Sequence, residues 1–145
     1  SADDQVIAEQ LKAVGINCTI DTVEWGTWYD EVYKGRNYHG TIIGFDASDA
    51  MTAQSLLARY ESTHSKNMNN YVSQRYDEVY NAALNATDEA EQVELYKQAQ
   101  RILAEDASNV YLQDPCDFVA VRKGLEGYVF YPIYVMDLAG VHFTK

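Results

Sequence analysis

A helical pattern, a glycine and an alternating pattern follow one another at the start of the chain, and this order most constrains the fold. In DDQVIAEQLKAVGI, residues 3–16, apolar side chains recur near helical spacing, and Gly15 stands where a helix would end. INCTIDTVE, residues 16–24, then alternates apolar and polar side chains and is rich in β-branched residues. The sequence therefore predicts a helix followed by a strand.

Four further helices are expected beyond this unit. Thr27 can cap a helix that ends at Gly35, and a short helix is centred on residues 53–59. Helical patterns that begin at Ser73 and Thr87 are separated by a break of two or three residues, which predicts an αα-hairpin. The remaining strand-like segments are residues 40–45, 109–114, 116–123, 128–132 and 136–143.

The order of these elements predicts an α/β fold in which a mixed β-sheet is covered by helices. The chain has 145 residues, which suffices for one domain with a core and is too short for two full ones. Hydrophobic residues make up 47% and charged residues 23%, as in ordinary globular proteins. We therefore expect a single domain over residues 1–145.

Charge and hydropathy exclude two classes of partner. The 22 acidic and 11 basic residues give a formal net charge of -11, and no cluster of Lys or Arg relieves it. A basic patch is what neutralises phosphates, so we expect no nucleic-acid partner. No apolar run approaches the roughly 20 residues that a membrane span needs, so we expect no direct membrane span in this chain.

Common catalytic and metal-binding signatures are absent from the sequence. His39, His64 and His142 lie far apart, and the chain has neither a glycine-rich phosphate loop nor a GxSxG elbow. Cys18 and Cys116 lack CxxC spacing and a neighbouring His, so we expect buried small side chains, with a disulfide between them as the alternative. We predict no cofactor and no metal.

The segment GFDASD, residues 44–49, is the candidate binding site. Ligands gather beyond the carboxyl ends of strands in open α/β sheets, and this turn delivers Phe45, Asp46, Ser48 and Asp49 to such a place. An aromatic ring followed by carboxylates suits an amine-bearing ligand with an apolar body. Trp25, at the end of the preceding strand, could line the same mouth. The alternative puts both aromatic side chains in the core and uses the aspartates as helix caps.

Five motifs occur in an order that is familiar from one family. They are AEQLKAVGI, EWGTWYDEVYKG, GTIIGF, TDEAEQVELYKQAQRILAED and VAVRKGLEGY. With these motifs the chain resembles, over nearly its whole length, the C-terminal lobe of the solute-binding proteins of peptide-type ABC importers, which serve oligopeptides, dipeptides or nickel.

The resemblance implies a fold, a function and a location. It implies one lobe of a periplasmic-binding-protein type II-like fold, and a chain that is a C-terminal lobe fragment of a longer two-lobed protein. Such proteins capture short peptides or a similar small solute in the cleft between the lobes and deliver it to ABC permease membrane subunits. They are extracytoplasmic, either in the periplasm or on the cell surface as lipoproteins. No catalytic step is implied, so we expect no enzyme.

The resemblance also assigns roles to individual residues. It implies that Trp25 and Phe45 line the cleft and that an aspartate binds the amino group of a peptide. Counting without gaps puts Ser48 at that aspartate's position, with Asp49 one residue later and Asp46 two residues earlier. Either Asp49 takes the role or the chain binds a different solute. Two other functions remain open: an enzyme that uses Asp46 or Asp49 as a general base, and a sensor.

Overall fold

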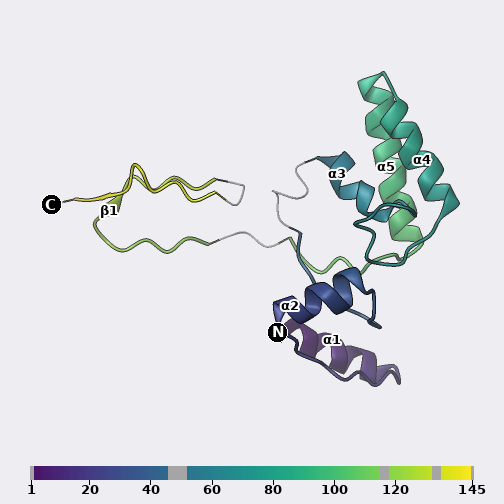
Figure 1. Ribbon diagram of the computed structural model, residues 1–145, viewed down its shortest axis with the longest axis horizontal. Coiled ribbons are helices and arrows are strands. Elements are labelled where there is room, and N and C mark those ends of the chain that lie inside the picture. Colours follow the sequence, from purple (N-terminus) through teal and green to yellow (C-terminus); the bar gives the residue numbers. More distant parts are fainter. Residues whose placement is uncertain (1, 46–51, 115–117, 132–134, 145) are drawn as a thin grey trace. The chain divides into compact units, whose positions relative to one another are not determined.

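The computed structural model describes residues 2–45, 52–114, 118–131 and 135–144 (Figure 1). The chain divides into two compact units, residues 1–44 and residues 45–145. They are named unit 1 and unit 2 below.

Unit 1 begins with helix α1, Ala2–Ala13. Asp3 and Asp4 lie in its first turn and Lys12 in its last, where their charges oppose the helix dipole. Gly15 follows with φ +89°, a left-handed conformation that glycine adopts without strain. The prediction of a helix that ends at Gly15 is confirmed.

The second helix of unit 1 starts earlier than predicted and changes type along its length. A single α-helical turn, α2 (Trp25–Thr27), leads into a π-helix, η1 (Trp28–Lys34). Thr27 therefore lies inside the helix, and its side chain makes no capping bond. Gly35 ends the helix as expected. A Cβ atom there would lie 2.6 Å from the carbonyl oxygen of Glu31, so a larger residue does not fit without a shift.

The described residues of unit 1 include no buried side chain. Residues 16–24 and 40–45 are extended, and their apolar side chains remain accessible; Ile16, for example, is 52% exposed. Cys18 is an exposed free thiol, so the expectation that it is buried is wrong, and Cys116 lies outside the described residues.

Unit 2 starts with two short helices. Helix α3, Ala53–Leu57, continues into the 3-10 helix η2, Ala58–Tyr60, which confirms the predicted helix near residues 53–59. Thr52 caps α3: its side chain accepts a hydrogen bond from the Ser55 amide, and the Ser55 hydroxyl reaches back to the Thr52 backbone.

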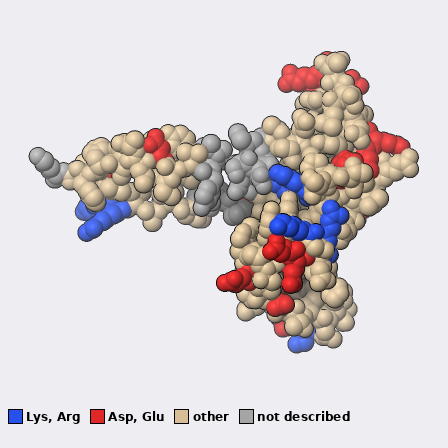
Figure 2. Space-filling view, viewed as in Figure 1, with Lys and Arg blue, Asp and Glu red and all other residues tan. Residues whose placement is uncertain are grey.

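The predicted αα-hairpin is confirmed. Helices α4, Gln74–Asn85, and α5, Glu89–Glu105, lie side by side (Figure 1). Ser73 caps α4, and Asp88 caps α5, one residue beyond the predicted Thr87. Acidic side chains gather at the end of the hairpin where α5 begins (Figure 2). Their negative charges stabilise α5 because they lie near the positive end of its dipole.

The core of unit 2 is built around the tyrosines of this hairpin. The ring of Tyr76 stacks on that of Tyr80 at 6.1 Å between centroids and 3° between planes, and it meets Tyr60 and Tyr71 edge-on. Such aromatic pairs stabilise a fold beyond the area they bury. The buried core residues are Leu57, Ala58, Tyr60, Tyr76, Tyr80, Ala83, Tyr96, Ala99, Ile102 and Leu103.

The prediction of a mixed β-sheet covered by helices is wrong. The described residues form one sheet, in which β1, Leu125–Glu126, pairs antiparallel with β2, His142–Phe143. Gly127 follows β1 with φ +81°, and a Cβ atom there would lie 2.0 Å from the Gly140 carbonyl oxygen. Most of the described part of the chain that has regular structure is helical.

The other strand-like segments are extended but unpaired. Residues 109–114 and 118–122 have no strand partner among the described residues, and side chains such as Val110 and Phe118 are 83% and 96% exposed. An extended segment becomes a strand only when a neighbour accepts and donates its backbone hydrogen bonds. Alternating apolar and polar side chains are therefore not sufficient for these segments to form the predicted mixed sheet.

The end of α5 carries a strained alanine. Asp106 is the C-cap, and Ala107 follows with φ +49°, a conformation that costs an L-residue about 1 kcal/mol or more. We expect Ala107→Gly to raise the free energy of unfolding by about 1 kcal/mol, measured by urea titration. Ala82→Gly, at an exposed position inside α4, should lower it by a similar amount. A destabilised Ala107→Gly variant would contradict this reading of the helix end.

Candidate functional site

Trp25 belongs to a surface group of four rings, the aromatic cluster: Trp25, Trp28, Tyr29 and Tyr33. The indoles of Trp25 and Trp28 stack with centroids 5.0 Å apart and planes at 14°. Tyr29 and Tyr33 stack at 5.3 Å, and each also lies within 6.4 Å of one indole. Trp25 is nevertheless 66% exposed. The alternative that buries Trp25 in a core is not what the described part of unit 1 shows.

Two polar contacts hold the aromatic cluster. The indole N–H of Trp28 donates to the hydroxyl oxygen of Thr41 at 2.9 Å. On the other side, the ammonium of Lys34 lies 4.5 Å from the centroid of the Tyr29 ring and bonds Asp30 at 2.8 Å. The bond to Asp30 raises the pKa of the Lys34 ammonium, which lies over the Tyr29 ring.

Phe45 opens unit 2 and is partly covered by Arg59. The guanidinium carbon of Arg59 lies 4.3 Å from the centroid of the Phe45 ring, and Arg59 itself is only 4% exposed. Phe45 remains 39% exposed. One face of this ring therefore carries a cation, and the rest is accessible to a solute.

The three remaining predicted site residues, Asp46, Ser48 and Asp49, lie outside the described residues. Their ligand roles stay predictions. The helix that follows them is capped by Thr52, so the alternative in which an aspartate caps that helix does not hold. Trp25 and Phe45 lie in different units, and their sharing of one site also stays a prediction.

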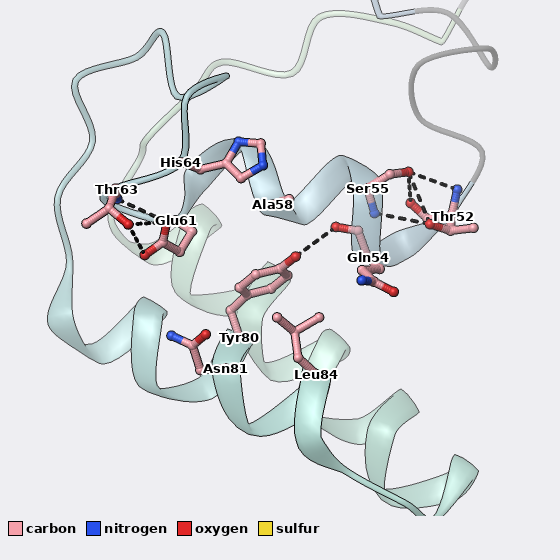
Figure 3. Close-up of a pocket in the computed structure, with 10 residues that line it drawn as sticks. All are labelled: Thr52, Gln54, Ser55, Ala58, Glu61, Thr63, His64, Tyr80, Asn81 and Leu84. Carbon is pink, nitrogen blue, oxygen red and sulfur yellow. Dashed lines mark hydrogen bonds between the residues drawn. The ribbon is translucent and has the colours of Figure 1, made fainter.

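A groove of about 450 Å³ lies between α3, the loop after η2, and α4 (Figure 3). Most of its polar groups already bond within the protein. The Tyr80 hydroxyl donates to the Gln54 carbonyl at 3.1 Å, and the Glu61 carboxylate accepts from the Thr63 amide and hydroxyl at 3.0 Å. The groove therefore offers few uncommitted polar groups to a ligand.

The loop that walls this groove is fixed to the end of α5. The Asp106 carboxylate accepts hydrogen bonds from the Tyr71 hydroxyl at 2.5 Å and from Arg75 at 2.9 Å. The bond from Tyr71, with the nearby charge of Arg75, holds the pKa of Asp106 below its usual value. Burial and the same carboxylate raise the pKa of Tyr71 to about 12. These groups stabilise the loop, and their shifted pKa values have a structural cause.

Metal-ligand clusters and membrane-spanning helices are both absent from the described residues. Nowhere in this part of the chain do three His, Cys, Asp or Glu side chains come together as metal ligands. Likewise, no helix among the described residues has both the length and the apolar character to cross a bilayer.

Thr41 and Arg59 are the site residues that sequence reasoning missed. Thr41 lies 13 residues from Trp28, and nothing in the spacing links the two. Arg59 falls on the inward side of a short helix, where hydropathy does not predict a charged side chain. The stack of Trp25 on Trp28 did have a signal, because residues three apart share a helix face.

Comparison with known proteins gives matches along nearly the whole chain. Di/tripeptide-binding protein 2 of Pseudomonas aeruginosa (strain UCBPP-PA14) is 30% identical over 141 residues, 94% of this chain and 26% of that protein. The dipeptide-binding protein of Escherichia coli (strain K12) is 27% identical over 88% of the chain, and oligopeptide-binding protein AppA of Bacillus subtilis (strain 168) is 26% identical over 88%.

These relatives are named for binding and not for catalysis, in agreement with the expectation that the chain is not an enzyme. No family model matches the chain. The chain spans about a quarter of the length of the curated relatives it matches. The order of motifs and these matches agree: di- and oligopeptide-binding proteins are similar to this chain over 88–94% of its residues.

Proposed function

We propose that this chain is the C-terminal lobe of a longer extracytoplasmic binding protein that captures short peptides, or a similar small solute, for an ABC permease. The observation that carries the proposal is the match over 94% of the chain to a protein named for di- and tripeptide binding. A periplasmic location is supported by the name of another relative, a probable D,D-dipeptide-binding periplasmic protein of Escherichia coli (strain K12). A cell-surface lipoprotein would serve the same function.

The mechanism we propose is binding by closure of two lobes, without a chemical step. Trp25 and Phe45 supply exposed aromatic surface to the solute, as their 66% and 39% exposure allows. Asp49 supplies the carboxylate for the peptide's amino group, and Asp46 and Ser48, close to it in the sequence, are the other polar candidates. The Arg59 guanidinium covers one face of Phe45, so the solute packs against the remaining surface of that ring.

Replacing Asp49 in the longer protein tests this function. We expect Asp49→Ala to weaken binding of a dipeptide with a free amino terminus by about ten- to a hundredfold, the worth of a charged hydrogen bond. The N-acetylated dipeptide should lose little, because it has no ammonium group. Isothermal titration calorimetry of both peptides measures the difference. Asp21→Ala, at an exposed position, is the matched control. Equal affinity for both peptides, in wild type and variant alike, would refute the role of Asp49.

A further inference from the structure

We propose that Thr41 is a positioning residue that sets the orientation of the Trp25 indole through Trp28. The inference rests on the proposed function, in which Trp25 contacts the solute. Thr41 does not touch the solute in this arrangement. Its hydroxyl holds one of two stacked rings from outside the helix.

The stack makes the orientation of Trp25 depend on that of Trp28. The two ring centroids are 5.0 Å apart with planes at 14°, so the flat faces of the two indoles lie against each other. Tyr29 is its second aromatic neighbour, at 6.4 Å and a tilt of 30°. Because Trp25 is 66% exposed, little else in the described part of unit 1 restrains its rotamer.

Within the described part of the chain, one hydrogen bond ties the Trp28 side chain to another segment. An indole has one hydrogen-bond donor and no acceptor, and the indole N–H of Trp28 donates to the Thr41 hydroxyl oxygen at 2.9 Å. Thr41 lies in the extended segment that follows the helix, so the bond ties the helix to its neighbour. The other ring near Trp28, Tyr33 at 6.1 Å, belongs to the same helix and cannot fix the ring against that segment.

The helix that carries Trp28 is of an uncommon type, so we expect side-chain contacts to stabilise it. The segment Trp28–Lys34 is a π-helix, which is rare and frequently marks functional sites. Its side contact is the Lys34 ammonium, which lies over Tyr29 and pairs with Asp30. That contact acts on Tyr29, whereas the hydrogen bond with Thr41 acts on Trp28.

Two substitutions at Thr41 distinguish the effect of the side chain's hydroxyl from the effect of its branched shape. Thr41→Val keeps the branched shape and removes the acceptor, whereas Thr41→Ser keeps the acceptor. Trp25 and Trp28 are the only tryptophans of this chain, so the exciton couplet of their stacked indoles in far-ultraviolet circular dichroism reports the stack directly. We expect Thr41→Val to reduce the couplet and Thr41→Ser to retain it. Trp25→Ala, which abolishes the stack, identifies the signal.

Peptide affinity in the longer protein provides the second measurement. We expect Thr41→Val to weaken binding of a dipeptide about three- to tenfold, the effect of one lost hydrogen bond, and Thr41→Ser to restore it. A wild-type couplet in Thr41→Val overturns the inference, as does an equal loss in both variants. If Trp25→Ala leaves peptide affinity unchanged while Thr41→Val still reduces the couplet, the role of Trp25 in binding fails and the positioning by Thr41 stands.

Discussion

Tyr76→Ala is expected to lower the free energy of unfolding of unit 2 by about 3 to 5 kcal/mol, the cost of emptying a fully buried aromatic site. Tyr76 is 0% exposed and is the ring around which the core of unit 2 is arranged. Its hydroxyl also donates to the carbonyl of Leu57 at 2.6 Å, which ties α4 to the end of α3. The substitution therefore removes both a ring contact and a tie between helices.

Two further variants divide this effect between the ring and the hydroxyl. Tyr76→Phe keeps the ring and leaves the Leu57 carbonyl without its donor, so we expect a loss of about 1 to 3 kcal/mol. Val72→Ala, at a side chain that is 77% exposed, should change stability little. Urea titration followed by circular dichroism of the helices measures all three. A Tyr76→Ala variant as stable as Val72→Ala would show that this ring does not organise the core.

Alkaline pH is expected to destabilise unit 2 through the same tyrosines. Burial raises the pKa of Tyr60 to about 12 and raises that of Tyr76 further, with neighbouring phenols adding to the effect. A raised pKa means that the ionised phenol is tolerated better in the unfolded chain. The stabilisation is therefore complete below the unfolded pKa of 10.0 and is lost as the pH rises toward 12.

The size of the alkaline effect follows from the pKa of Tyr60. A pKa difference of two sets an upper limit of about 3 kcal/mol, and because solvent screens part of the effect we expect about 1 to 2 kcal/mol from this one side chain. Unfolding free energies measured by urea titration at several alkaline pH values, together with tyrosinate absorbance, check the prediction. Tyr60→Phe should flatten part of the dependence. A free energy that stays constant while the phenols ionise would contradict it.

The helices were predictable because the sequence signals that define a helix lie within the helix or next to its ends. Apolar spacing, a capping residue and a terminal glycine all lie within the element, and they placed α1, α4 and α5 nearly correctly. The start at Trp25 was missed because Glu24 precedes it without a side-chain capping bond. That error separated Trp25 from Trp28, although their spacing of three residues places both rings on one helix face.

The sheet was not predictable in the same way. Alternation in residues 109–114 shows which side chains share a face, but not which segment supplies the backbone partners. Among the described residues, pairing joins Leu125–Glu126, which has no strand-like pattern, with His142–Phe143, the end of the strand-like segment 136–143. The bond from Trp28 to Thr41 and the cation over Phe45 are likewise contacts between side chains that spacing does not encode.

The uneven burial of the two units determines how cooperative the unfolding of this chain can be. Unit 2 has a packed aromatic core, whereas the described residues of unit 1 bury no side chain. Regions with few buried contacts open at lower free energy than a core does. Both tryptophans lie in unit 1, whereas helices lie in both units, so fluorescence follows unit 1 and helical dichroism follows both. A single two-state midpoint is therefore not a property of the whole chain.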